Sequence, residues 1–277
     1  MNDIDFSKIY SYSKIDLFDK CKKKYHFNYL DPEIAPIRKQ FLKPRDYNTK
    51  GSAVHGAITL FYYLPKSERN FNNLKECLKK SWYSELDIYR QPPLGLLGGF
   101  KNIDQERTGY LDSLKMLRNF IKIEKEENPS LFYIPVETIR KSFEDYEKMI
   151  KPVNKKIFIS GKFDRIDELK NGNLKVIDFK TGKSKNGLGQ LEFYKLLAEM
   201  NFDRKVDEVS YHYLNDGKVE NFDVSKVKTS SIKKKILDKV KEIEETKIFA
   251  PNPTRLCDHC DFKEICPVFE QKEIKGR

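Results

Sequence analysis

Two acidic residues and one lysine stand at spacings that suit metal-dependent chemistry. Asp178 and Lys180 are two residues apart in a segment of strand-like composition, so their side chains project from the same face of a strand. Asp164 lies in the preceding strand-like segment, and Asn171-Gly172 between the two segments is a hairpin signal. Carboxylates that converge across such a hairpin repel each other unless a cation lies between them. We therefore expect a divalent cation and a bound water here, although for a single Asp-x-Lys taken alone a surface hairpin with an ordinary salt bridge is by far the better explanation.

The cysteines form a second pattern that points to a metal site. Cys257, Cys260 and Cys266 have the spacing C-x2-C-x5-C, and Cys21 lies far upstream. Four thiolates of this kind suit an iron–sulfur cluster or a structural zinc site, and the spacing does not decide between them. Cys77 is left over, and we expect it to be a buried thiol in a helix over residues 71–90.

Composition narrows the class of protein. The 277 residues carry a net charge of +11 and are 39% hydrophobic, which is typical of a globular chain. The charge favours a polyanionic partner, either nucleic acid or an anionic membrane surface, although a general lysine bias explains it as well. No run approaches the roughly 18 apolar residues of a membrane span, and residues 1–6 lack the apolar run of a secretory signal. We expect a cytoplasmic protein that does not bind membranes.

Periodicity and turn residues predict an α/β chain. Residues 31–50 are expected to be loop, and 91–100 a Pro- and Gly-rich joint. The expected helices cover 8–30 with Ser13 as N-cap, 52–64 capped by Ser52 and ended by Pro65, 71–90, 104–127, 188–201 and 226–247. The expected strands cover 131–137, 156–161, 163–167, 174–180, 207–214 and 218–224.

The motifs taken together resemble the RecB-type PD-(D/E)XK nucleases. The resemblance extends from residue 10 to 267, and the motifs occur in the order found in that family. They are Gly161-Lys162-Phe163-Asp164-Arg165-Ile166-Asp167, Val176-Ile177-Asp178-Phe179-Lys180-Thr181-Gly182, Gln190-Leu191-Glu192-Phe193-Tyr194 and Gly51-Ser52-Ala53-Val54-His55. Tyr12-Ser13 through Cys21, together with the C-terminal cysteines, is similar to the cluster-binding ends of AddB nucleases and of CRISPR-associated RecB-like nucleases.

This resemblance implies a role for each matching residue. The divalent ion, Mg2+ or Mn2+, would be bound by His55, Asp164, Asp178 and the backbone carbonyl of Phe179. Lys180 would position or deprotonate the attacking water, and Glu137 would be the acid that precedes the core. A 4Fe-4S cluster would be bound by Cys21, Cys257, Cys260 and Cys266.

Two residues of these motifs have alternative interpretations. A lone histidine such as His55, between Ala53 and Ala57, is more often structural, and only the resemblance favours the metal. Gln190 and Tyr194 are four residues apart and so share a helix face, where they could contact DNA at the mouth of the cleft. Tyr194 could instead pack in the core.

The implied fold is a restriction-endonuclease-like mixed central sheet flanked by helices, with an N-terminal helical region and a cysteine-ligated cluster. We expect residues 1–277 to form a single nuclease domain. Residues 65–130 would be a helical insertion or subdomain, and residues 10–30 plus 250–270 would form the cluster-binding region.

The sequence therefore predicts a metal-dependent DNA exonuclease or end-processing nuclease directed at single strands or free ends. Its expected settings are DNA repair, recombination, phage DNA processing or CRISPR adaptation, with a helicase or a CRISPR adaptation protein as partner. The alternatives are a catalytically weak DNA-binding module of the same fold and a zinc-stabilised interaction domain.

Overall fold

The computed structural model describes residues 5–83, 94–135, 149–182 and 187–269. The described chain divides into two compact units. The first is drawn from Met1–Lys43, Pro152–Ile159 and Lys233–Arg277, and the second from Pro44–Lys151 and Ser160–Ile232. The first unit therefore combines segments that are far apart in the sequence, whereas the two segments of the second unit are separated only by Pro152–Ile159.

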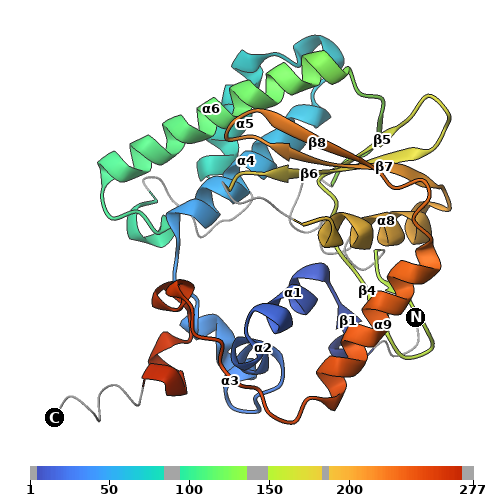
Figure 1. Ribbon diagram of the computed structural model, residues 1–277. Coiled ribbons are helices and arrows are strands. Elements are labelled where there is room, and N and C mark those ends of the chain that lie inside the picture. Colours follow the sequence, from blue (N-terminus) through green and yellow to red (C-terminus); the bar gives the residue numbers. More distant parts are fainter. Residues whose placement is uncertain (1–4, 84–93, 136–148, 183–186, 270–277) are drawn as a thin grey trace. The chain divides into compact units, whose positions relative to one another are not determined.

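A mixed five-stranded sheet forms the centre of the second unit. Its strands are β2 (Leu131–Tyr133), β5 (Arg165–Glu168), β6 (Leu174–Lys180), β7 (Val206–Tyr213) and β8 (Lys218–Asp223), in the order β2-β5-β6-β7-β8. Strands β6 and β7 are parallel, and the other pairs are antiparallel. Helices α4 (Asp46–Tyr63), α5 (Phe71–Tyr83) and α6 (Ile103–Glu127) cover one face, and α8 (Gly189–Phe202) covers the other (Figure 1). The expected α/β class with a mixed sheet between helices is confirmed.

The side chains of β6 alternate as the sequence predicts. Ile177 and Phe179 are buried in the hydrophobic core that α4, α5 and α6 form over the sheet. Asp178 and Lys180 contact each other and Gln190 of α8. Because neighbouring side chains on a strand point to opposite faces, the apolar pair anchors the strand while the polar pair faces α8.

The predicted hairpin joins β5 to β6. Gly172 has φ +81°, a conformation that costs glycine little because it has no Cβ. Its amide donates to the carbonyl of Leu169 at 2.9 Å, and the amide of Leu169 donates to the carbonyl of Asn173 at 2.8 Å. The hairpin brings the start of β5 opposite the C-terminal half of β6, with Arg165 paired to Ile177.

Helix α4 begins earlier than the sequence analysis predicts. It starts at Asp46, so Ser52 lies inside it and is not its N-cap. The predicted loop 31–50 also contains α3 (Ile34–Ile37) and a short 3-10 helix. A side chain at Gly51, inside this helix, would be crowded, because a Cβ there would lie 3.1 Å from the Thr181 hydroxyl oxygen. The predicted end before Pro65 is confirmed, since the helix ends at Tyr63.

The other two helices on this face agree with the prediction where the structure describes them. Helix α5 covers the first part of the expected 71–90 segment, and the remainder lies outside the described residues. Helix α6 is capped by Asn102, whose side chain accepts from the amide of Gln105. Glu137 and the end of the expected 131–137 strand also lie outside the described residues.

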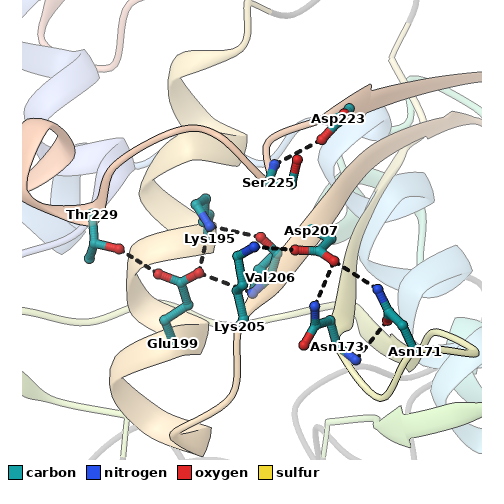
Figure 2. Close-up of polar contacts among 10 residues, drawn as sticks. All are labelled: Asn171, Asn173, Lys195, Glu199, Lys205, Val206, Asp207, Asp223, Ser225 and Thr229. Carbon is teal, nitrogen blue, oxygen red and sulfur yellow. Dashed lines mark hydrogen bonds and ion pairs between the residues drawn. The ribbon is translucent and has the colours of Figure 1, made fainter.

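A polar cluster anchors α8 to its neighbours (Figure 2). The buried Lys195 donates to the carbonyl of Val206 at 2.7 Å and forms an ion pair with Glu199 at 2.5 Å. Glu199 also accepts from the amide of Val206 and from the hydroxyl of Thr229, the first residue of α9 (Thr229–Glu245). Buried charges are tolerated when they are paired and hydrogen-bonded. This cluster joins the helix that carries Gln190 to the beginning of β7.

The N-terminal helical segment of the first unit is interrupted at Cys21. The expected helix 8–30 is instead α1 (Tyr12–Lys20) and α2 (Lys22–Tyr29). Cys21 is extended, with φ −162°, and its thiol accepts from the amide of Lys24 as the N-cap of α2. The N-cap of α1 is Ser11, not Ser13. This correction follows from cap geometry, since either serine fits the sequence pattern.

The small sheet of this unit has shorter strands than predicted. Only Phe158–Ile159 of the expected strand 156–161 form a strand, β4. It pairs in parallel with β1 (Ile9–Tyr10), and β3 (Lys151–Pro152) completes the order β1-β4-β3.

The first and last segments of the chain pack directly on each other in the first unit. The ring of Phe249 contacts Phe18 and His26, and the ring of Phe262 contacts Phe27. Two short 3-10 helices, Arg255–His259 and Lys263–Ile265, carry the C-terminal cysteines. Among the described helices, none combines the length and apolarity that crossing a membrane requires.

Candidate active site

Asp164 is held at the start of the β5–β6 pair by the backbone of β6. It directly precedes β5, so the predicted position on the strand itself is one residue off. Its Oδ2 accepts from the amide of Phe179 at 2.9 Å, and its Oδ1 lies 3.0 Å from Nδ1 of His55. Because Phe179 is anchored in the core, the carboxylate is attached to a rigid part of the sheet.

His55 extends from α4 toward the same carboxylate. Burial lowers the pKa of His55, but the charge of Asp164, the hydrogen bond to it and the charge of Asp178 together outweigh burial, and the pKa is raised overall. For Asp164 itself, burial raises the pKa, whereas His55 and the amide of Phe179 lower it below the usual value. An ionised carboxylate only accepts hydrogen bonds, so Nδ1 of His55 carries the proton in this contact. The lone pair of a neutral His55 is therefore on Nε2.

Asp178, Lys180 and Gln190 form a closed polar group beside Asp164. Nζ of Lys180 lies 2.6 Å from Oδ2 of Asp178 and donates to Oε1 of Gln190 at 2.8 Å. The amide nitrogen of Gln190 donates to Oδ1 of Asp178 at 3.0 Å and lies 3.3 Å from the hydroxyl of Tyr194. Tyr194 also packs against Phe163 at a ring distance of 5.6 Å. Gln190 thus connects the carboxylate, the amine and the tyrosine.

The two carboxylates are in electrostatic conflict. Burial and the negative charge of Asp164 raise the pKa of Asp178 to about 6, even though Lys180 acts in the opposite direction. A divalent cation would relieve this conflict, because it stabilises both ionised forms.

The residues fit a divalent ion by their chemistry. Carboxylate oxygens suit Mg2+ and Mn2+, and an imidazole nitrogen is a good ligand for Mn2+. Within the described ranges, no three His, Cys, Asp or Glu side chains are already gathered at metal-binding geometry. His55, Asp164 and Asp178 are the donors that could hold the ion.

Comparison with known proteins identifies the family. The profile of the PD-(D/E)XK nuclease superfamily matches residues 9–267. The chain belongs to the PD-(D/E)XK nuclease superfamily. It is therefore a nuclease that hydrolyses phosphodiester bonds, and the match does not separate RecB-type or AddB-like members from other branches.

A solved structure titled "Crystal structure of SSO0001" is 13% identical to this nuclease, and the match covers 96% of this chain and 89% of the other. Its TM-score of 0.36 is too low to carry an argument about fold or function. No curated protein matches the nuclease significantly.

A cavity of about 970 Å³ adjoins His55 and Asp164 of the nuclease, and Asp178 is not among its lining residues. Residues from the first half of α4, from the middle of α6, and from the segments that flank β5, β6 and β7 line it. They include His55 and Asp164 together with Lys50, Lys162 and Asp112. The sequence indicates no role for these last three residues. Lys50 and Asp112 are isolated charges in separate helices, and Lys162 is seen only as part of the motif that contains Asp164.

The sequence analysis also missed a buried charge network on the opposite face of β5. Arg165 is fully buried and pairs with Glu124, with Glu127 at 3.1 Å and with Asp167 at 2.9 Å. Lys175 pairs with Glu127 at 3.0 Å. Burial raises the pKa of Asp167 to about 6. This network attaches α6 to the strand that follows Asp164.

The four predicted cluster cysteines of the nuclease all lie in its first unit. The charge of Cys21 contributes to raising the pKa of Cys260, after burial as the largest cause, so these two thiols are near each other. Cys257 lies within the hydrogen-bonded turn that follows Thr254, and Cys266 ends the last 3-10 helix. The four are not arranged as a metal-binding group among the described residues. Cys77 is buried in α5 as expected.

Proposed function

We propose that this nuclease is a Mn2+- or Mg2+-dependent DNA exonuclease or end-processing nuclease that acts on single strands or free ends. His55, Asp164, Asp178 and the carbonyl of Phe179 would hold the ion, and Lys180 would act beside the attacked phosphate. The observation that carries the proposal is the convergence of Asp164 and Asp178, with Nζ of Lys180 at 2.6 Å from Asp178.

Positive charge next to the phosphate is what the proposed phosphodiester hydrolysis requires. When bound, a divalent ion lowers the pKa of its water and neutralises the phosphate. Lys180 is a compact positive charge held by Asp178 and Gln190, and a preorganised charge of this kind stabilises negative charge that develops on the phosphate. His55 presents Nε2 to the ion only in its neutral form, since the imidazolium has no free lone pair.

The test uses the full chain and end-labelled single-stranded DNA, duplex DNA and RNA, each with Mn2+, Mg2+ or EDTA. We expect cleavage of single-stranded DNA from an end with Mn2+ or Mg2+, and none with EDTA. Asp178→Asn and Lys180→Met should abolish it. Asp238→Asn and Lys234→Met, which make the same changes on exposed positions of α9, should cleave like the wild type.

The outcomes separate the proposal from its alternatives. Cleavage that survives both active-site changes would show that Asp178 and Lys180 are not needed for catalysis. Tight DNA binding without cleavage at any divalent ion would indicate a binding module of the same fold. Internal cuts in circular single-stranded DNA would contradict the requirement for an end.

We also propose that Cys21, Cys257, Cys260 and Cys266 bind a 4Fe-4S cluster. Their membership in one unit and the proximity of Cys21 to Cys260 support this assignment. Anaerobic purification should yield a brown protein with equal iron and acid-labile sulfide, and Cys257→Ser should lose both. A colourless protein with one equivalent of zinc would establish the zinc alternative.

The biological setting rests on the family resemblance alone. DNA with a free end is the proposed partner. A helicase or a CRISPR adaptation protein would supply such ends in repair, recombination, phage DNA processing or CRISPR adaptation. Pull-down with the catalytically inactive Asp178→Asn chain, followed by identification of specifically retained proteins, tests this part of the proposal.

A further inference from the structure

The cavity beside His55 and Asp164 combines three kinds of side chain that together suit an unpaired nucleotide. Lys50 and Lys162 supply positive charge, Tyr47 supplies an aromatic ring, and Asn48 and Asn215 supply amides. Lysines bind phosphates, aromatic rings stack on unpaired bases, and amides bind base edges. The Tyr47 side chain is 57% exposed, so its ring is accessible for stacking.

The size of the cavity suits a short piece of one strand. Cavities of about 300–1,000 Å³ hold one drug-sized molecule, and the volume here is about 970 Å³. One or two unstacked nucleotides fit such a space.

The charges in the cavity show where a phosphate would bind. Nζ of Lys50 lies 3.4 Å from the carboxylate of Asp112, whose side chain is 53% exposed. The Lys50 side chain is 20% exposed, so solvent reaches the pair mainly from the Asp112 side. Ion pairs open to solvent contribute only about 0–1 kcal/mol, so a phosphate can replace Asp112 as the partner of Lys50. Lys162 is exposed two residues before Asp164, which places a second positive charge next to the proposed metal ligands.

We propose that this cavity binds an unpaired nucleotide of the DNA strand next to the attacked phosphate. Lys50 and Lys162 contact its backbone phosphates, Tyr47 stacks on its base, and Asp112 opposes binding by competing for Lys50. This inference rests on the proposed function and adds the residues that select single strands.

The experiment measures DNA binding in EDTA, so that it does not depend on cleavage. The probes are a fluorescein-labelled oligothymidylate and a blunt duplex, each titrated with the full chain at several salt concentrations. Each lost phosphate contact reduces the slope of log K against log salt by about 0.7 for a single strand. Lys50→Gln and Lys162→Gln should each show this reduction.

Matched variants separate a site effect from net charge. Lys122→Gln removes an equal charge from the exposed side of α6, where Lys122 is 75% exposed, and should leave the slope close to that of the wild type. Asp112→Asn should tighten binding by up to about fivefold, since it removes a competing ion pair of about 1 kcal/mol. The control variant Asp104→Asn changes an exposed carboxylate at the start of α6 and should not tighten binding. A gain of affinity cannot result from misfolding.

Tyr47→Leu tests the stacking contact. It should weaken binding to the oligothymidylate about fivefold or more, because stacking contributes about 1–3 kcal/mol per base, and should leave the salt slope and duplex binding unchanged. The inference is overturned if Lys50→Gln, Lys162→Gln and Asp112→Asn behave like their controls, or if Tyr47→Leu weakens both probes equally. If the binding shifts occur but the wild type cleaves no end with any divalent ion, the inference stands and the proposed function fails.

Discussion

Gln190 accepts a hydrogen bond from Lys180 at 2.8 Å, and its amide nitrogen donates to Asp178, the partner of that lysine. The amide therefore fixes the position of the amine relative to the carboxylate. In the sequence analysis Gln190 was expected to contact DNA at the mouth of the cleft. In the DNA-free structure its polar atoms are engaged within the protein.

Gln190→Met should slow cleavage without weakening DNA binding. Methionine keeps the length of the side chain but makes none of these hydrogen bonds. Hydrogen bonds to charged groups contribute about 1.5–3 kcal/mol, so we expect the single-turnover rate to fall about 10- to 100-fold. Tyr194→Phe is the control, since it removes the 3.3 Å contact and leaves the hydrogen bonds of Gln190 to Lys180 and Asp178 in place. It should have a much smaller effect. Weaker DNA binding with an unchanged rate would instead support the DNA-contact role.

Asp178→Asn should stabilise the metal-free protein while removing its response to metal. The pKa of Asp178 is raised to about 6, above its value in an unfolded chain. The folded protein therefore loses stability as the pH rises toward 6 and this carboxyl group ionises. At pH 7 the destabilisation by the ionised Asp178 is fully present. Since one pKa unit corresponds to about 1.4 kcal/mol, the gain from the uncharged residue is on the order of 1–3 kcal/mol.

Urea unfolding at pH 7 checks this prediction. In EDTA the variant should have the higher midpoint. With Mn2+ the wild type should gain stability, by about 2.7 kcal/mol at a metal concentration 100 times the Kd, and the variant should not. A variant that is less stable than the wild type in EDTA would contradict the assigned conflict between the two carboxylates.

Gly56→Ala should destabilise the contact between α4 and α5. A Cβ at this position would lie 2.2 Å from Oγ and 3.3 Å from Cβ of Ser81. Alanine in a helix is otherwise favoured over glycine by about 1 kcal/mol, but overpacking costs about 1–3 kcal/mol. We expect a net loss, measured by urea unfolding.

A double-mutant cycle identifies the cause of this loss. Ser81→Gly removes both contacting atoms, so Gly56→Ala should cost less in that background than in the wild type. Additive effects would show that the two side chains do not collide.

Lys14 should make the stability of the first unit depend on pH. Burial lowers the pKa of Lys14 to about 8, and its amine donates to the carbonyls of Ser7 and Ile9. Between pH 8 and the higher pKa of the unfolded chain, the unfolded state binds more protons at this residue. Stability therefore rises with pH in this range and is lowest below pH 8.

The comparison with Lys14→Met isolates this effect. The unfolding free energy of the wild type relative to the variant should increase from pH 8 to pH 10. Burial also raises the pKa of Tyr10, to about 12, but this contribution is common to both proteins and cancels in the difference. A difference that does not change with pH would refute the lowered pKa of Lys14.

Local sequence patterns were sufficient to predict the strands of the second unit and the order of the helices along the chain. The alternation at Ile177, Asp178 and Phe179 and the turn at Gly172 depend on neighbouring residues only, and the structure has both. Helix boundaries were less predictable. Helix α4 begins at Asp46, before the predicted cap Ser52, and its N-cap Arg45 makes no side-chain cap hydrogen bond, so no capping signal in the sequence marks its start.

The sequence by itself was enough to predict which chemistry the chain carries, because Asp178 and Lys180 lie on β6 and Asp164 directly precedes β5, and a short hairpin dictates the pairing of these two strands. Only the tertiary structure decided what surrounds them. Lys50, Asp112 and Lys162 come together from two helices and a strand end, and the distances between such elements are set by core packing rather than by any local spacing. The same packing directs Gln190 toward Lys180, because the anchored α8 determines where its side chains point.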